Sequence, residues 1–155
     1  MIRQLLYRSG QLYEFTPSCM QQLLSRARVR NSEQGITGML LHFDGLFMQL
    51  LEGPVAVVDA LYARIATDPR HCEVRLLVRG EVRKPLLPQQ PLAWAEGLME
   101  GDVPMFPGVE AEQAALDVLM RAGDNRVAAA MLGFLRGEQV PGGGLGCARL
   151  MERVL

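Results

Sequence analysis

Residues 35–53 read GITGMLLHFDGLFMQLLEG, two apolar runs on either side of Asp44-Gly45. Aspartate and glycine both tolerate the positive φ that the central positions of a type I′ turn require, so this stretch predicts a β-hairpin. Side chains alternate along a strand, which places Phe47, Gln49 and Leu51 on one face. Gln49 is therefore an amide among hydrophobic side chains, and it needs a hydrogen-bond partner from the backbone, another side chain or a ligand.

The segments around this hairpin alternate between strand and helix patterns. Residues 2–9 alternate as a strand, and Thr16-Pro17 begins a helix that ends near residues 28–31. After the hairpin, Gly53-Pro54 begins a second helix, and a strand follows over residues 74–78. The inner stripe of this second helix comprises Val58, Leu61, Tyr62 and Ile65. The order β-α-β-β-α-β predicts an α+β ferredoxin-like sandwich, with both helices on one face of an antiparallel sheet and a groove between them.

The remainder of the chain adds one strand and a helical region. Residues 83–91 are rich in proline and predict a loop, and a short fifth strand with Trp94 follows around residues 92–98. Residues 110–121 and 124–136 predict a helical hairpin broken at Gly123, and a last helical turn or two ends at Leu155. We expect residues 2–99 to form the functional domain and residues 108–155 a helical extension that is not an independent domain. The apolar stripes of the extension are expected mainly to pack in the core, and a contact with a partner is the second interpretation.

Composition excludes several classes of function. The chain has 155 residues, 49% of them hydrophobic and 21% charged, with a formal net charge of −1. These values fit one globular domain and give no basic footprint for a nucleic acid. Three widely spaced cysteines and two isolated histidines do not make a metal site. No run approaches the roughly 20 apolar residues of a membrane span, and we expect a cytoplasmic protein.

Several motifs, in a fixed order, closely resemble the BLUF family of flavin-binding blue-light receptors. They are Tyr7-Arg8-Ser9, Asn31, Gly35-Ile36-Thr37-Gly38, the Gln49-Leu50-Leu51-Glu52-Gly53 run, Asp68-Pro69-Arg70-His71 and Trp94. The resemblance covers residues 2 to about 99. It implies a non-covalently bound flavin, usually FAD, with FMN and riboflavin as alternatives, whose ring lies in the groove between the two helices.

The resemblance also assigns roles around that ring. Leu23 and Ile65 clamp it between apolar walls, and Asn31 faces its pyrimidine edge. Gln49 bridges Tyr7 and the ring, so that the excited flavin takes an electron and then a proton from the phenol while the amide rotates or tautomerises. The expected signature is a small red shift that reverses in the dark. Trp94 is expected to take part in passing the change on.

The charged residues of these motifs have implied roles and ordinary alternatives. Arg28 or Arg30, with Arg64 and Asp68, would hold the ribityl chain and phosphate, and Arg70 and His71 would lie at the ring edge. From the residues alone, Arg64 and Asp68 make a surface ion pair equally well. Asn31 also suits a helix C-cap, Tyr7 a core tyrosine, and His71 an uninvolved loop residue.

Two residues depart from the family pattern. Pro91 stands where the family usually has an aromatic residue, three positions before Trp94. Glu96 stands where the family commonly has methionine, two residues after Trp94, so it either points to solvent or pairs with a cation. The orientation of Trp94 is therefore left open.

We expect a blue-light sensor that is not an enzyme. It would act as a homo-oligomer and relay its signal to a downstream protein through contacts of the C-terminal helices. One alternative is a protein-interaction module of the same fold without photochemistry. Another is an acylphosphatase-like hydrolase that uses Arg8 and Asn31, although no phosphate-cradling glycine loop follows Ser9.

Overall fold

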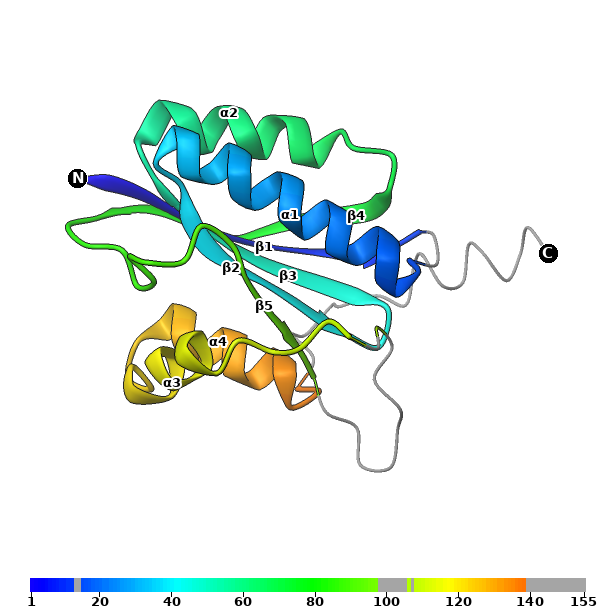
Figure 1. The fold of residues 1–155 in the computed structure, drawn as a ribbon. Coiled ribbons are helices and arrows are strands. Elements are labelled where there is room, and N and C mark those ends of the chain that lie inside the picture. The colour runs from blue at the N-terminus through cyan, green and yellow to red at the C-terminus, as the bar shows by residue number, and fades with distance from the viewer. Residues whose placement is uncertain (13–14, 98–105, 107, 139–155) are drawn as a thin grey trace.

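A computed structural model describes residues 1–12, 15–97, 106 and 108–138. Five strands form one mixed sheet in the order β4-β1-β3-β2-β5. The strands are β1 (Ile2–Gln11), β2 (Thr37–Phe43), β3 (Leu46–Gly53), β4 (His71–Val82) and β5 (Ala93–Glu96). The helices are α1 (Pro17–Gln34), α2 (Val55–Ala66), α3 (Gln113–Arg121) and α4 (Arg126–Leu135). Helices α1 and α2 cover one face of the sheet, and α3 and α4 cover the other (Figure 1).

The predicted ferredoxin-like order is confirmed. Strands β1 to β4 pair antiparallel, and β5 adds to the free edge of β2 in parallel. The turn between β2 and β3 has positive φ at both Asp44 (49°) and Gly45 (75°), as a type I′ turn requires. The Asp44-Gly45 turn therefore sets the pairing of β2 with β3, and β3 is the central strand of the sheet.

Helix α1 is longer than predicted. Its N-terminus follows the prediction, because the Thr16 hydroxyl accepts from the backbone N–H of Cys19 and proline begins the helix. The predicted end near residues 28–31 was wrong, since the helix continues to Gln34 and is capped by Gly35, which has a φ of 72°. Glycine adopts this left-handed conformation without a Cβ penalty. Asn31 is thus a buried residue inside the helix and not its C-cap.

Other boundaries of helices and strands also differ from the prediction. Strand β4 begins three residues earlier and ends four residues later than predicted, along the edge of the sheet beside β1. The helical hairpin is present as α3 and α4, which begin later than the predicted starts. The helical turn predicted to end at Leu155 lies outside the described residues.

Alternation along the strands gives the sheet two chemically different faces. One row across four strands joins Tyr7, Gln49, Leu40 and Trp94 on the face covered by α1 and α2. The opposite face carries an apolar core that the C-terminal helices complete. Its fully buried members include Leu6, Met39, Leu41, Met48, Leu50, Leu119 and Met131.

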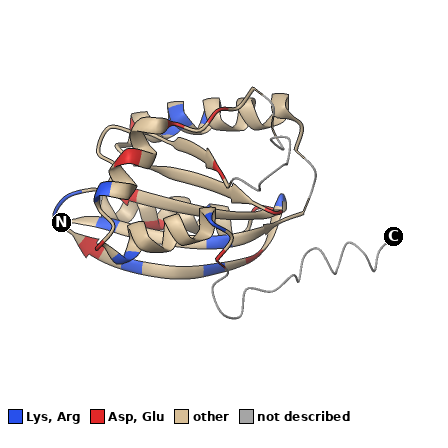
Figure 2. Ribbon diagram, turned by 90° about the horizontal axis from the view of Figure 1, so that it is seen from below, with Lys and Arg blue, Asp and Glu red and all other residues tan. Residues whose placement is uncertain are grey.

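Charged residues of both signs are spread over the elements (Figure 2). This agrees with a formal net charge of −1. Within the part of the chain that the structure describes, no helix has the length and apolar character needed to cross a membrane.

Candidate functional site

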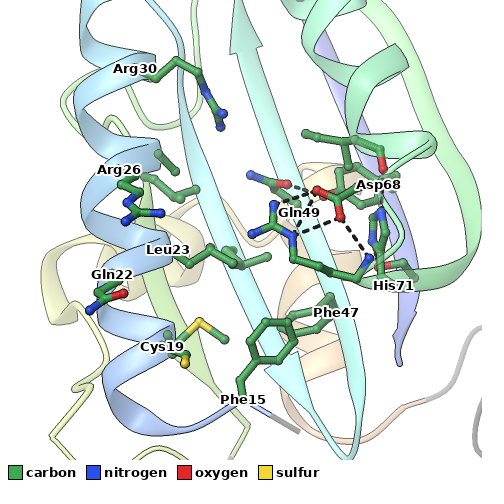
Figure 3. A pocket seen from close by; sticks show the side chains of 18 residues that line it. Phe15, Cys19, Gln22, Leu23, Arg26, Arg30, Phe47, Gln49, Asp68 and His71 are labelled. Atoms are coloured by element: carbon green, nitrogen blue, oxygen red, sulfur yellow. Dashed lines mark hydrogen bonds and ion pairs between the residues drawn. The ribbon is translucent and has the colours of Figure 1, made fainter. Parts of the chain in front are cut away.

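A pocket of about 630 Å³ lies on the sheet face that α1 and α2 cover. Its size falls within the range of about 300–1,000 Å³ that is usual for small-molecule sites. Apolar side chains form much of its wall, and polar side chains project into it from α1 and from the turn before β4 (Figure 3). The lining residues that carry the chemistry are Tyr7, Ser9, Leu23, Arg26, Arg30, Gln49, Ile65, Asp68, Arg70 and His71.

Tyr7 and Gln49 face each other across β1 and β3. The Tyr7 hydroxyl donates a hydrogen bond to Gln49 Oε1, and both residues are buried. The remaining polar group of the amide is its Nε2 donor, for which no described residue provides an acceptor. Gln49 therefore has one end satisfied by a phenol and a free donor on a side chain that lines the pocket.

The Tyr7 phenol is held in its protonated form. Burial raises the pKa of Tyr7 well above its usual range, and the nearby Tyr62 and Asp68 raise it further. The Tyr62 ring lies 5.6 Å from the Tyr7 ring, centroid to centroid. At neutral pH the hydroxyl is consequently a hydrogen-bond donor to the amide.

His71 is fixed at the pocket wall by both ring nitrogens. Its Nε2 lies 2.6 Å from the Ile65 carbonyl oxygen, and its Nδ1 lies 2.8 Å from Ser9 Oγ. A carbonyl oxygen only accepts, so Nε2 carries the proton and Nδ1 of the neutral ring accepts from the Ser9 hydroxyl. His71 is the first residue of β4 and lines the pocket, so it does not lie in a loop.

Asp68 pairs with Arg70 rather than with Arg64. The Asp68 carboxylate accepts from Nε, Nη2 and the backbone N–H of Arg70. These contacts lower the pKa of Asp68, with the Arg70 side chain as the main cause. The predicted spacing failed because α2 ends at Ala66, so Asp68 lies in the turn and not on the helix.

The predicted arginines separate into two groups. Arg30 lines the pocket, whereas Arg28 and Arg64 are not among the described lining residues. Arg28 Nε donates to the Leu92 carbonyl oxygen at 2.7 Å, and its Nη2 pairs with Glu112 on the other side of β5. Arg28 thus links α1 to Leu92, just before β5, and to Glu112, just before α3.

Arg26 lines the pocket and was not predicted from the sequence. Its spacing from Leu23 and Arg30, at i+3 and i−4, was the available signal, because these positions share one helix face. Burial, together with the cations Arg64 and Arg70, lowers the pKa of Arg30. This concentration of positive charge favours an anionic group at this end of the pocket.

Asn31 has one satisfied and one orphaned end. Its Nδ2 donates to the Pro91 carbonyl oxygen at 2.8 Å, while its Oδ1 is buried without a partner. Asn31 is not among the lining residues, but it lies one turn after Ala27, which is. A buried acceptor without a donor is costly, so the site fits a ligand that supplies one.

Trp94 and Glu96 both lie on the pocket side of the sheet. Trp94 is fully buried and stacks with His42 at 6.3 Å between centroids, and its Nε1 has no partner. Glu96 Oε1 lies 3.3 Å from His42 Nδ1, so this carboxylate accepts a hydrogen bond from a histidine ring and does not pair with an arginine or lysine among the described contacts. Burial lowers the pKa of His42 to about 4.

No group of His, Cys, Asp and Glu side chains in the described part of the chain is arranged to hold a metal ion.

A family model described as sensors of blue light using FAD matches residues 2–90. Photoactivated adenylate cyclase subunit beta of Euglena gracilis is 41% identical over 71 residues, which make up 46% of this chain and 8% of that protein. The structure of Klebsiella pneumoniae BlrP1 with manganese and cyclic-diGMP has a TM-score of 0.69 at 25% identity, covering 87% of this chain and 33% of that one. Dark-state BlrB, described as a BLUF protein, has a TM-score of 0.61 at 24% identity, covering 86% and 93%.

Proposed function

This chain belongs to the BLUF family of blue-light sensors that use FAD, and we propose that it is a flavin-binding photoreceptor switched by Tyr7 and Gln49. The observation that carries the proposal is the buried phenol-to-amide hydrogen bond at the wall of the pocket. It leaves the Gln49 Nε2 donor available to a ligand.

The pocket residues suit a flavin ring. Leu23 and Ile65 come from the two helices and supply apolar contacts on either side. Asn31 lies outside the lining, one turn after Ala27, and its buried Oδ1 is proposed to accept from a ring N–H. Gln49 Nε2 is a donor for a ring nitrogen or carbonyl oxygen. We propose that Arg70 and His71 contact the edge of the ring. FAD is the expected cofactor, with FMN and riboflavin as alternatives.

The ribityl and phosphate groups would lie at the cationic end of the pocket. Arg30 is proposed to bind the phosphate, with Arg26 one turn away on the same face of α1. Asp68 accepts hydrogen bonds well and is proposed to hold ribityl hydroxyls. Arg64 contributes through its charge near Arg30, and Arg28 is not assigned to the cofactor because Leu92 and Glu112 occupy its side chain.

When bound, the flavin supplies absorption of blue light and an oxidising excited state. Tyr7 is the group that releases an electron and a proton, and Gln49 is the path by which the proton leaves and returns. After the amide has turned or tautomerised, its donor and acceptor ends are interchanged relative to the Tyr7 hydroxyl. Leu40 and Trp94 continue the same row across the sheet, and they are proposed to pass this change to β5.

We propose no catalytic activity for this chain and an output through a partner protein. The chain spans 8% of the length of the photoactivated cyclase subunit, so the adenylate cyclase activity in that protein's name need not belong to the matched part. A homo-oligomer remains part of the proposal. An acylphosphatase-like site is disfavoured, because it needs Arg8 and Asn31 together. Arg8 is the register partner of Met48, whose side chain lies on the sheet face opposite the pocket, whereas Asn31 lies on the helix that covers the pocket face.

The test is an absorption spectrum of the purified chain reconstituted with FAD, recorded before and after blue illumination. We expect a flavin spectrum that shifts to the red in the light and returns in the dark. Parallel samples with FMN and riboflavin show which flavin binds best. A colourless protein after reconstitution would favour the interaction module without photochemistry.

A further inference from the structure

We propose that Glu52 is a positioning residue for flavin recognition, because it fixes the loop that sets the orientation of the Asn31 amide. This assignment rests on the proposed function, and it adds a residue that lies outside the pocket. Glu52 is three residues after Gln49 on β3 and completely buried. Among the residues that the structure describes, its side chain hydrogen-bonds with Gln4, Leu86 and Leu87, none of which lines the pocket.

Glu52 binds the segment that precedes β5. Its carboxylate accepts from the backbone N–H of Leu86 at 2.8 and 2.9 Å and from that of Leu87 at 3.2 Å. Gln4 Nε2 donates to Oε2 at 3.1 Å from the neighbouring strand. A buried carboxylate is stable only with such donors, and here most of them come from one loop.

The same loop then reaches Asn31 in a few residues. The Gly38 N–H donates to the Gln90 carbonyl oxygen at 2.8 Å, which holds the loop against β2. The next residue, Pro91, provides the carbonyl oxygen that accepts from Asn31 Nδ2, also at 2.8 Å. The position of this carbonyl therefore depends on two anchors along the loop, and Glu52 is the anchor that a side chain provides.

The Pro91 carbonyl decides which end of Asn31 is left for a ligand. Because a carbonyl only accepts, it takes the Nδ2 end and leaves the buried Oδ1 as an acceptor. If the loop moved away, the amide could turn and present Nδ2 instead. Two N–H donors would then meet at the imide N–H of a flavin, so Glu52 acts on ring recognition through Asn31.

The test compares two ligands that differ at this one group. Riboflavin carries the imide N–H, and 3-methylriboflavin carries a methyl group in its place. The dissociation constants of both are measured by flavin fluorescence for the parent, Glu52→Gln, Glu52→Ala, Asn31→Ala and the Glu52→Ala/Asn31→Ala double variant. Glu33→Gln, an exposed glutamate on the same helix as Asn31, is the matched control.

We expect the parent and Glu33→Gln to prefer riboflavin by about 10-fold, the usual effect of one buried hydrogen bond. The preference should fall to near 1 in Asn31→Ala and in Glu52→Ala, with no further change in the double variant. Glu52→Gln keeps one acceptor oxygen and should show an intermediate preference, which also serves if Glu52→Ala does not fold. A general loss of stability would weaken both ligands alike and leave their ratio unchanged.

The proposal is overturned if the Glu52 variants keep the parent's preference, or if the parent itself shows none. Failure of the proposed function gives a different result, since neither ligand would then bind to the parent.

Discussion

At the scale of single residues, the site depends on two carboxamides that each have one committed end. Gln49 accepts from the Tyr7 hydroxyl, and Asn31 donates to the Pro91 carbonyl oxygen. The Pro91 carbonyl oxygen can only accept, and the Tyr7 hydroxyl donates to Gln49 Oε1, so in this arrangement the other end of each amide is left for a ligand. The protein thereby presents a donor from one amide and an acceptor from the other.

A buried histidine makes stability depend on pH. Burial lowers the pKa of His42 from 6.5 to about 4, so below pH 6.5 the unfolded chain binds a proton that the folded chain does not. We expect the free energy of unfolding to fall between pH 6.5 and 4, by at most about 3 kcal/mol from this group. Urea unfolding at several pH values measures the effect.

The matched variant is His42→Phe, which keeps an aromatic ring beside Phe47 and Trp94 but cannot titrate. Its free energy of unfolding should change less over the same pH range, whatever its value at neutral pH. Equal slopes for the parent and the variant would contradict the role given to His42.

The position of a residue could be predicted where it follows from a local pattern. The contacts that a long side chain makes with distant segments could not. The alternation of side chains along β3 predicted the sheet face on which Gln49 lies, and the family motif predicted Tyr7 as its partner. The contacts of the Arg28 guanidinium with Leu92 and Glu112 could not be predicted, because both depend on how the C-terminal region passes β5. Sequence spacing holds no information on such a contact.

At the scale of elements, the β2–β3 hairpin brings two backbones unusually close. A Cβ built on Gly38 would lie 1.9 Å from the Leu50 carbonyl oxygen, a distance that no side chain tolerates. Gly38 also donates its N–H to the loop at Gln90. The Gly-Ile-Thr-Gly motif, which runs into the start of β2, is therefore a packing requirement at Gly38 as well as part of the family resemblance.

Gly38→Ala should lower the free energy of unfolding by about 3 kcal/mol, the cost of severe overpacking. The matched variant is Gly80→Ala on β4, where an added Cβ would meet nothing within 4 Å. That change should stay within about 0.5 kcal/mol. Chemical denaturation of both variants checks this, and similar losses would show that the approach at Gly38 is not the cause.

The turn and the helix start were predictable because each is set by adjacent residues. Asp44-Gly45 satisfies the turn, and Thr16 caps the backbone N–H of Cys19. The end of α1 was not predictable from the polar run after Ala27, since arginine, serine and glutamate are good or neutral on an exposed helix face. Only Gly35 ends the helix, by adopting a left-handed conformation.

At the scale of the whole molecule, the sheet separates a polar site from an apolar support. The pocket lies under α1 and α2, while the opposite face forms one core with α3 and α4. Arg28 and Glu112 connect the two sides around β5, and the Glu112 N–H donates to the Trp94 carbonyl oxygen at 2.9 Å. We propose that the C-terminal helices fold with the sheet as one unit and receive changes from β5.

This unit can be tested with two methionines of the C-terminal helices. Met131 is fully buried against the sheet, and Met120 is 64% exposed. Met131→Ala should lower the free energy of unfolding by about 2–5 kcal/mol, with a single transition. Met120→Ala should change it by less than about 0.5 kcal/mol. A separate early transition of the helices in Met131→Ala would mean that they form an independent unit.

The switch between Tyr7 and Gln49 is tested most directly by the light-minus-dark absorption spectrum of FAD-loaded variants. The parent and Tyr62→Phe, which alters the tyrosine 5.6 Å from Tyr7, should both show a red shift that reverses in the dark. Tyr7→Phe and Gln49→Leu should bind FAD and show no shift, because the phenol or the amide is missing. A reversible red shift of normal size in flavin-loaded Gln49→Leu would contradict this account.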